Sequence, residues 1–254
     1  MQLVFVGDER SRWFRIPQQA GVPMQRFIEK DKASLDDVIT AMNNNLTDED
    51  DCAIVFSLIF DLITMKKSPY LPPNAPELFT VNSLIDMNTI FEQISNAMQD
   101  WSQRFPNLKV IWVLPHPVNF VQYNQILISN AGLNVNLQEQ SNLAVQLERD
   151  AKILFSRINH LKTMWRERLQ YPFIHLSEIF FSKSRCGDTF AMNSEKIMWP
   201  KGYTVDGIHP SVKLTKSFGN TLWRWMTIIG IKPLEIAQRK NYTKVSLLIL
   251  LIDF

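Results

Sequence analysis

Short apolar runs alternate along the chain with longer amphipathic stretches. Five runs predict strands, at residues 2–6, 22–28, 52–60, 109–114 and 172–176. Apolar positions at helical spacing predict helices at residues 35–46, 83–104, 141–169 and 211–229, with a further helix beginning near Ser11. Strands that alternate with helices indicate a parallel sheet covered on both faces. The expected fold class is therefore α/β, a three-layer α/β/α arrangement around about five parallel strands.

Local signals mark some of the boundaries between these elements. Ser34 is a suitable N-cap for the helix at 35–46, because Asp36 and Asp37 follow in its first turn. Residues 68–76 contain four prolines and predict a loop. Residues 118–140 are rich in Asn and Gln without clear periodicity, so we expect a long loop with some helix, and a candidate lid.

The pattern predicts one domain over residues 1–232 and a C-terminal tail over 233–254. No internal repeat is visible. The apolar run at 245–252 is shorter than the roughly 20 residues that span a bilayer. Two interpretations of this run remain. It is either a strand or partner-binding segment, or translated intron, since Lys-Val-Ser-Leu at 244–247 is also what a splice donor encodes.

Charge is distributed unevenly around a net value of +2. Residues 1–150 hold 11 basic and 18 acidic side chains, whereas residues 151–254 hold 16 and 7. A basic C-terminal part favours an anionic partner such as RNA, and solvated helix faces are the alternative. The candidate anion-binding or RNA-binding residues are Arg10, Arg12, Lys201, Lys213, Lys216 and Arg224, the last four of which lie near Trp199, Trp223 and Trp225.

The two cysteines, Cys52 and Cys186, are too few for a disulfide framework and suit a reducing compartment. No secretory signal or membrane-spanning run is visible, so we expect a cytoplasmic or nuclear protein. We expect no cofactor and no metal ion. The expected partners are RNA or protein.

Two short segments carry the candidate chemistry. Residues 4–12 read VFVGDERSR at the end of the first predicted strand, and residues 206–210 read DGIHP before the last predicted helix. Together they resemble the first and last blocks of the SGNH, or GDSL-type, hydrolases. The resemblance implies a flavodoxin-like fold and a Ser-His-Asp triad. Residues 7–12 further resemble the Gly-Asp-Ser-Arg-x-Arg pattern of one esterase branch, with Glu9 where the serine belongs.

Other positions also depart from the pattern that this resemblance implies. No glycine lies between Gly21 and Gly132, so the glycine that helps to hold the oxyanion has no candidate. Residues 52–61 resemble the strand that ends in Gly-x-Asn-Asp, but Phe60 precedes Asp61 in place of the asparagine. His209, with Asp206, remains. Losing one oxyanion donor alone typically costs about 10²–10³ in rate, so we expect serine-type acyl transfer to be absent.

The expected function is therefore a catalytically inactive binding or scaffold module. The inactive SGNH-like domain of Oskar, which the chain resembles, binds RNA, and this makes RNA the first candidate partner. The alternative is an SGNH-type esterase with an unorthodox nucleophile, Glu9 or Ser11, acting with His209. Ser11 lies about 200° around the helix from Glu9 and is expected to point away from His209.

The degenerate site is predicted to comprise Asp8, Glu9, Asp61, Asp206 and His209. If Glu9 faces His209 opposite Asp206, two carboxylates favour the imidazolium and form a structural ion pair. If Glu9 faces solvent, no such pair forms. These carboxylates could in principle also bind a hard metal ion, whereas Asp8 as a turn residue and Asp61 as a strand-end cap are the simpler interpretations.

Overall fold

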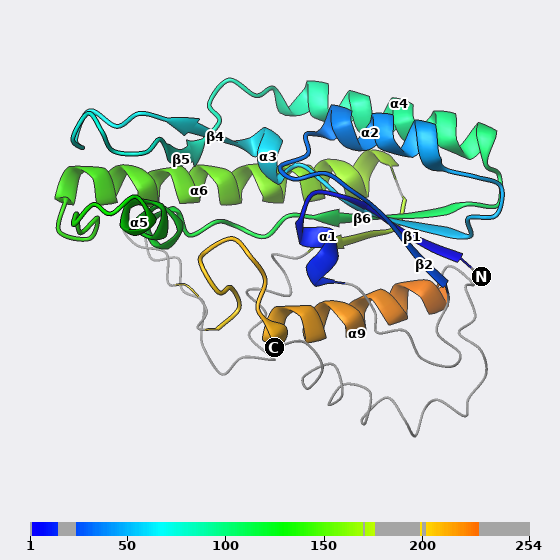
Figure 1. Cartoon of the computed structure of the whole chain (residues 1–254). Coiled ribbons are helices and arrows are strands. Elements are labelled where there is room, and N and C mark those ends of the chain that lie inside the picture. Colours follow the sequence, from blue (N-terminus) through cyan, green and yellow to red (C-terminus); the bar gives the residue numbers. More distant parts are fainter. Residues whose placement is uncertain (1, 15–23, 170, 176–198, 200–201, 229–254) are drawn as a thin grey trace.

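Five parallel strands form the central sheet of the chain, whose computed structural model describes residues 2–14, 24–169, 171–175, 199 and 202–228 (Figure 1). The sheet order is β2-β1-β3-β6-β7. The strand bounds are Gln2–Gly7 for β1, Met24–Glu29 for β2, Cys52–Phe56 for β3, Lys109–Leu114 for β6 and Phe173–His175 for β7. All four neighbouring pairs are parallel, as the alternation of strands and helices predicted.

The two faces of the sheet support two separate apolar cores. Successive side chains of a strand point to opposite faces, so Val4 and Val6 enter one core and Leu3 and Phe5 the other. The first core is covered by α2 (Leu35–Asn45), α4 (Met87–Arg104) and α6 (Ser141–Met164). The second is covered by α1 (Arg10–Trp13) and α9 (Val212–Ile228), which lie below the sheet in Figure 1. The three-layer prediction is confirmed.

Several helix boundaries follow from side-chain caps. The Ser34 hydroxyl accepts a hydrogen bond from the Asp37 backbone N–H, and the Asp37 carboxylate accepts one from the Ser34 N–H, which completes a capping box at the start of α2. Asp86 caps α4 by accepting from the Asn88 N–H. The helix predicted at 141–169 continues beyond α6 as a π-helical turn, η1 (Trp165–Leu169).

The strand predicted at 52–60 is too long. β3 ends at Phe56, Leu58 takes a left-handed backbone conformation (φ 78°), and a short helix, α3 (Ile59–Leu62), follows. The apolar run continues beyond the strand because β3, the turn at Leu58 and α3 all contribute side chains to the interior. The sequence also gave no sign of the antiparallel hairpin of β4 (Ile63–Lys66) and β5 (Leu78–Val81), which flanks the predicted loop at 68–76.

Residues 118–140 are more ordered than a long loop. They contain α5 (Phe120–Asn130), which packs on α6 and β5. The buried Asn124 amide accepts from the Phe79 N–H and donates to the Phe79 carbonyl, each at 2.8 Å, and so fixes α5 to β5. None of the helices in the described ranges is long and apolar enough to cross a membrane. The predicted tail, 233–254, lies outside these ranges.

Candidate functional site

The candidate site begins where β1 ends. Gly7 has φ 144°, and a Cβ atom there would lie 1.9 Å from the Phe56 carbonyl oxygen. Only glycine therefore permits this approach of β1 to the end of β3. The Asp8 N–H then donates to the same carbonyl at 3.3 Å, so the turn that carries Asp8 and Glu9 is fixed by backbone contacts.

The loop at 202–210 brings Asp206 and His209 together. The His209 Nδ1 lies 2.5 Å from the Asp206 Oδ2, while the Asp206 Oδ1 accepts from the backbone N–H groups of Ile208 (3.0 Å) and His209 (2.7 Å). The carboxylate thus orients both the ring and the backbone that carries it. The loop docks on the start of α5, where the Asn119 N–H donates to the Gly207 carbonyl at 2.9 Å.

Glu9 faces His209 from the opposite side. The Glu9 Oε1 lies 3.9 Å from the His209 Nε2, and the two side chains are 17% and 22% exposed. The Glu9 Oε2 accepts a hydrogen bond of 2.6 Å from the backbone N–H of Lys32, a residue with φ 53°. The carboxylate is therefore held between a backbone donor and the histidine, and is not directed into solvent.

The electrostatics of this trio favour a charged histidine. The hydrogen bond with Asp206 raises the pKa of His209, and the charges of Asp206 and Glu9 add to it, against burial and the charge of Arg10. Burial opposes ionisation of Asp206, but hydrogen bonds from the His209 ring and from backbone N–H groups outweigh it and lower the Asp206 pKa. His209 thus lies between the side chains of Asp206 and Glu9, and both favour its protonated form.

Asp8 and Arg10 form a buried ion pair beneath this trio. The Arg10 Nε lies 2.7 Å from the Asp8 Oδ1 and its Nη2 lies 2.5 Å from the Asp8 Oδ2. The same Nη2 donates to the Ser57 carbonyl at 3.1 Å. Arg10 is 1% exposed, so its assignment to an RNA-binding surface is wrong. It is buried because the Asp8 carboxylate compensates its charge.

Asp61, which we expected in the degenerate site, has another role. Both of its carboxylate oxygens lie 3.0 Å from the Leu35 backbone N–H, at the first turn of α2. Burial raises the pKa of Asp61, and the bonds from Leu35 act against that rise. The carboxylate therefore caps a helix and is not directed at His209. The Ser11 hydroxyl is not directed at His209 either. Ser11 is fully buried, and its hydroxyl donates to the Glu29 Oε2 at 3.4 Å.

Two residues beside the site were missed. His116 is fully buried, and its Nε2 bonds the Ile208 carbonyl at 2.7 Å, which supports the loop just before His209. Burial, followed by the charge of Arg10, lowers the pKa of His116 to about 3. The ring centroid of Tyr123 lies 6.2 Å from that of His209, and burial raises the Tyr123 pKa, with Asp206 and Glu9 adding to the rise. The PHP sequence after β6 was the available signal for His116.

The other predicted anion-binding residues are only partly placed. Lys213 and Lys216 are exposed on α9, and the Lys213 ammonium lies 4.6 Å from the centre of the Tyr203 ring. Lys201 and the side chains of Arg12 and Arg224 lie outside the described residues. Within the described ranges, no three His, Cys, Asp or Glu side chains are grouped so that they could hold a metal ion.

No protein-family model matches the sequence, and no curated protein matches it either. Solved structures do resemble the fold. A GDSL-like lipase from Bacteroides thetaiotaomicron matches with a TM-score of 0.54 at 11% identity, over 90% of this chain and 88% of that one. A member of the lipolytic G-D-S-L family from Veillonella parvula matches with a TM-score of 0.50 at 12% identity, over 89% and 98%. With its five-stranded parallel sheet and flanking helices, the chain has the fold of the SGNH (GDSL-type) hydrolases.

Proposed function

We propose that this chain is a binding domain with the fold of a GDSL-type hydrolase, in which serine-type acyl transfer is absent. The observation that carries the proposal is the position of Glu9. Its carboxylate takes the place of the serine in the motif, accepts the Lys32 N–H and faces His209. An internal anion thus faces the histidine that serine-type acyl transfer needs as its base.

The surrounding positions support the same conclusion. Leu58 corresponds to the glycine of Gly-x-Asn-Asp and has the left-handed conformation that glycine favours, although a leucine side chain costs about 1–2 kcal/mol there. Phe60, at the asparagine position, packs against the first apolar core. It offers no amide for an oxyanion. The left-handed turn is present at Leu58 and Asp61 stands at the last position of the motif, but the asparagine position carries the apolar side chain of Phe60.

Hydrolysis of p-nitrophenyl acetate tests the proposal, with wild type measured beside His209→Ala and Glu9→Ser. We expect wild type and His209→Ala to equal the buffer blank, and Glu9→Ser to gain slow turnover and to react with a fluorophosphonate. Wild-type turnover that disappears in His209→Ala would reject the proposal. It would favour the alternative, an esterase that uses Glu9 as its nucleophile.

RNA is a second candidate function, favoured by the pair of exposed lysines on α9. Lys213 and Lys216 lie three residues apart and so share one helix face. If both contact phosphates of a single strand, replacing both with alanine should reduce the slope of log affinity against log salt concentration by about 1.4. Lys109→Ala, at an exposed lysine that begins β6, is the control. An affinity for single-stranded RNA that does not change with salt would exclude this candidate.

A further inference from the structure

The loop at 202–210, which carries His209, is closed on itself. The Val205 N–H donates to the His209 carbonyl at 3.0 Å, and the Asp206 carboxylate bonds both the backbone of the loop and the His209 ring. Asp206 and His209 therefore move together if the loop moves. The distance between His209 and Glu9 depends instead on how the whole loop is docked.

Two consecutive carbonyl groups of this loop accept hydrogen bonds from the segment that follows β6. The Asn119 N–H donates to the Gly207 carbonyl at 2.9 Å, and the His116 Nε2 lies 2.7 Å from the Ile208 carbonyl oxygen. The exposed Gln122 amide makes a third contact with the loop, which is longer at 3.5 Å. His116 therefore contributes the shortest of these three contacts, and does so with a fully buried side chain.

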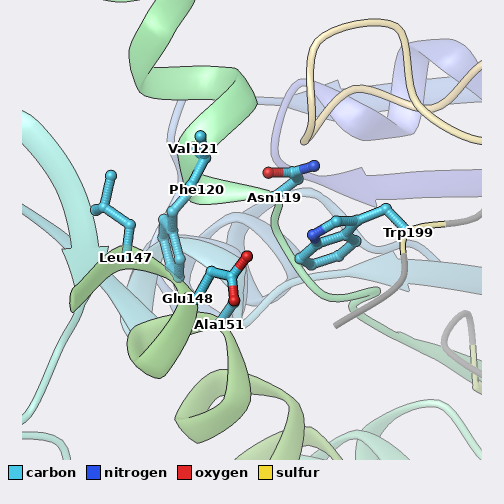
Figure 2. A pocket seen from close by; sticks show the side chains of 7 residues that line it. All are labelled: Asn119, Phe120, Val121, Leu147, Glu148, Ala151 and Trp199. Atoms are coloured by element: carbon cyan, nitrogen blue, oxygen red, sulfur yellow. The ribbon is translucent and has the colours of Figure 1, made fainter. Parts of the chain in front are cut away.

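The segment that carries His116 is itself held firmly. His116 lies between Pro115 and Pro117, and a residue that precedes proline is restricted to extended backbone conformations. Val118 and Phe120 follow, and both are buried in the first apolar core. Figure 2 shows the Phe120 ring directed from the start of α5 towards α6. The direction of the His116 side chain is thus fixed by the backbone on both sides of it.

The contact with Ile208 also determines where the proton of the His116 ring lies. A carbonyl oxygen only accepts hydrogen bonds, so the Nε2 of His116 must be the protonated nitrogen. Burial, and then the charge of Arg10, lower the pKa of His116 to about 3; the charge of His209 also lowers it, while that of Asp206 acts in the opposite direction. The ring is therefore a neutral Nε2–H donor at neutral pH.

We propose that His116 is a positioning residue that sets the distance between the His209 ring and the Glu9 carboxylate. The two side chains face each other at 3.9 Å, but they are docked separately: Glu9 accepts the Lys32 N–H, whereas the His209 loop is held through the Ile208 carbonyl. The inference rests on the contact between Glu9 and His209 in the proposed function. It does not require acyl transfer to be absent.

A double-mutant cycle tests the inference, with the pKa of His209 measured by NMR titration of its ring signals. The shift caused by Glu9→Gln reports the contact. Coulomb energy falls with distance and is screened by salt, so moving the loop from 3.9 Å to about 8 Å should reduce that shift to about half or less. We expect this reduction in His116→Leu, which lacks the donor. We expect none in His116→Gln, whose amide can still donate to Ile208.

Gly207→Ala disturbs the same docking without changing His116. Gly207 has φ 101°, and a Cβ there would lie 2.7 Å from the Asn119 carbonyl oxygen, so alanine must push the loop away from α5. Gly202→Ala is the matched control, because Gly202 also has a positive φ, 71°, but a Cβ there meets nothing within 4 Å. Only Gly207→Ala should reduce the shift caused by Glu9→Gln.

The wild-type protein provides a test that needs no variant, and it decides with Gly207→Ala if His116→Leu does not fold. Nitrogen chemical shifts of the His116 ring should show the Nε2–H tautomer, with no titration from about pH 5 to about pH 8. The other tautomer, or titration near the ordinary pKa of about 6.5, would overturn the inference.

Two outcomes of the cycle would also overturn it. One is a shift caused by Glu9→Gln that is as large in His116→Leu and Gly207→Ala as in wild type. The other is no shift in wild type, because the contact that His116 is inferred to position would then be absent. Failure of the proposed function has a different signature, ester hydrolysis by wild type that disappears in His209→Ala, and the cycle does not depend on that result.

Discussion

The two sides of the candidate site differ in how closely they follow the motifs that they resemble. The loop at 202–210 holds a complete Asp206–His209 pair, with the ring and backbone bonded by one carboxylate. The loops after β1 and β3 keep the close approach of Gly7 and the left-handed conformation of Leu58, but they carry Glu9 and Phe60 where the resembled motifs have serine and asparagine. Backbone geometry is constrained by packing, whereas a side chain at the edge of a site is replaceable. Four predictions test this difference.

The largest effect is expected at the backbone of the altered side. Gly7→Ala places a Cβ 1.9 Å from the Phe56 carbonyl oxygen, so β1 and β3 must separate. We expect a loss of about 4 kcal/mol or more in the free energy of unfolding, measured by urea titration.

Gly219→Ala is the matched control for this change. Gly219 lies inside α9, and a Cβ there meets nothing within 4 Å, so alanine should stabilise the protein by about 0.5–1 kcal/mol. A Gly7→Ala variant as stable as wild type would show that the approach of β1 to β3 is relaxed in solution.

The second prediction concerns the buried ion pair under both sides of the site. Asp8→Asn leaves the Arg10 guanidinium buried without its counter-charge, and should cost about 3–5 kcal/mol in unfolding free energy. Asp100→Asn removes an exposed partner of Arg104 at i,i+4 spacing, and should cost only about 0.3–0.5 kcal/mol. Equal costs in the two variants would mean that Asp8 and Arg10 are solvated.

Most of the fold could be predicted from the sequence, because the spacing of apolar residues indicates which faces of the helices and strands are buried. β6 begins and ends at the predicted residues, and the Ser34 cap is present. The end of β3 could not be predicted, since Leu58 and Ile59, which follow the strand, are as buried as the strand itself. For residues 118–140 we expected a long loop with some helix, and the bounds of α5 could not be predicted. The contact of α5 with β5 is made by a polar residue, Asn124, through two hydrogen bonds to Phe79.

The site was predictable where chemistry is local in sequence. Asp206 and His209, which the sequence placed together, are three residues apart and form one turn. The pair of Asp8 with Arg10 was not expected, although the two are only two residues apart, because Arg10 was assigned to RNA binding. Contacts between residues that are far apart in the sequence could not be predicted from it. Asp61 was grouped with the acids of the site, yet its partner is the Leu35 N–H. Lys32 contributes to the site through its backbone N–H, which donates to Glu9. A sequence pattern of side chains cannot show such backbone donors.

The third prediction separates the two histidines by pH. The pKa of His116 is lowered to about 3 in the folded protein, so the unfolded chain takes up a proton first and stability falls from about pH 6.5 towards pH 3. The pKa of His209 is raised, so its contribution is fully present below its unfolded pKa and is lost as pH rises through the folded pKa.

Urea midpoints measured from pH 4 to pH 9 check this contrast. His116→Gln should flatten the acid side of the profile, and His209→Gln the neutral-to-alkaline side. If His209→Gln changes the acid side instead, the ring of His209 is neutral and buried in the fold, which contradicts its pairing with Asp206.

The smallest effect is expected at Glu9 itself. Glu9→Gln removes a charge 3.9 Å from the His209 Nε2, so the pKa of His209 should fall, and by less than in Asp206→Asn, where a direct hydrogen bond is weakened as well. An NMR titration of the histidine ring signals measures both shifts, with Glu92→Gln on α4 as the control. If Glu9→Gln leaves the His209 pKa where it was while Asp206→Asn lowers it, Glu9 is turned away from the ring in solution. The two sides of the site would then be electrostatically independent, and the proposal that acyl transfer is absent would rest only on Glu9 standing at the serine position of the resembled motif.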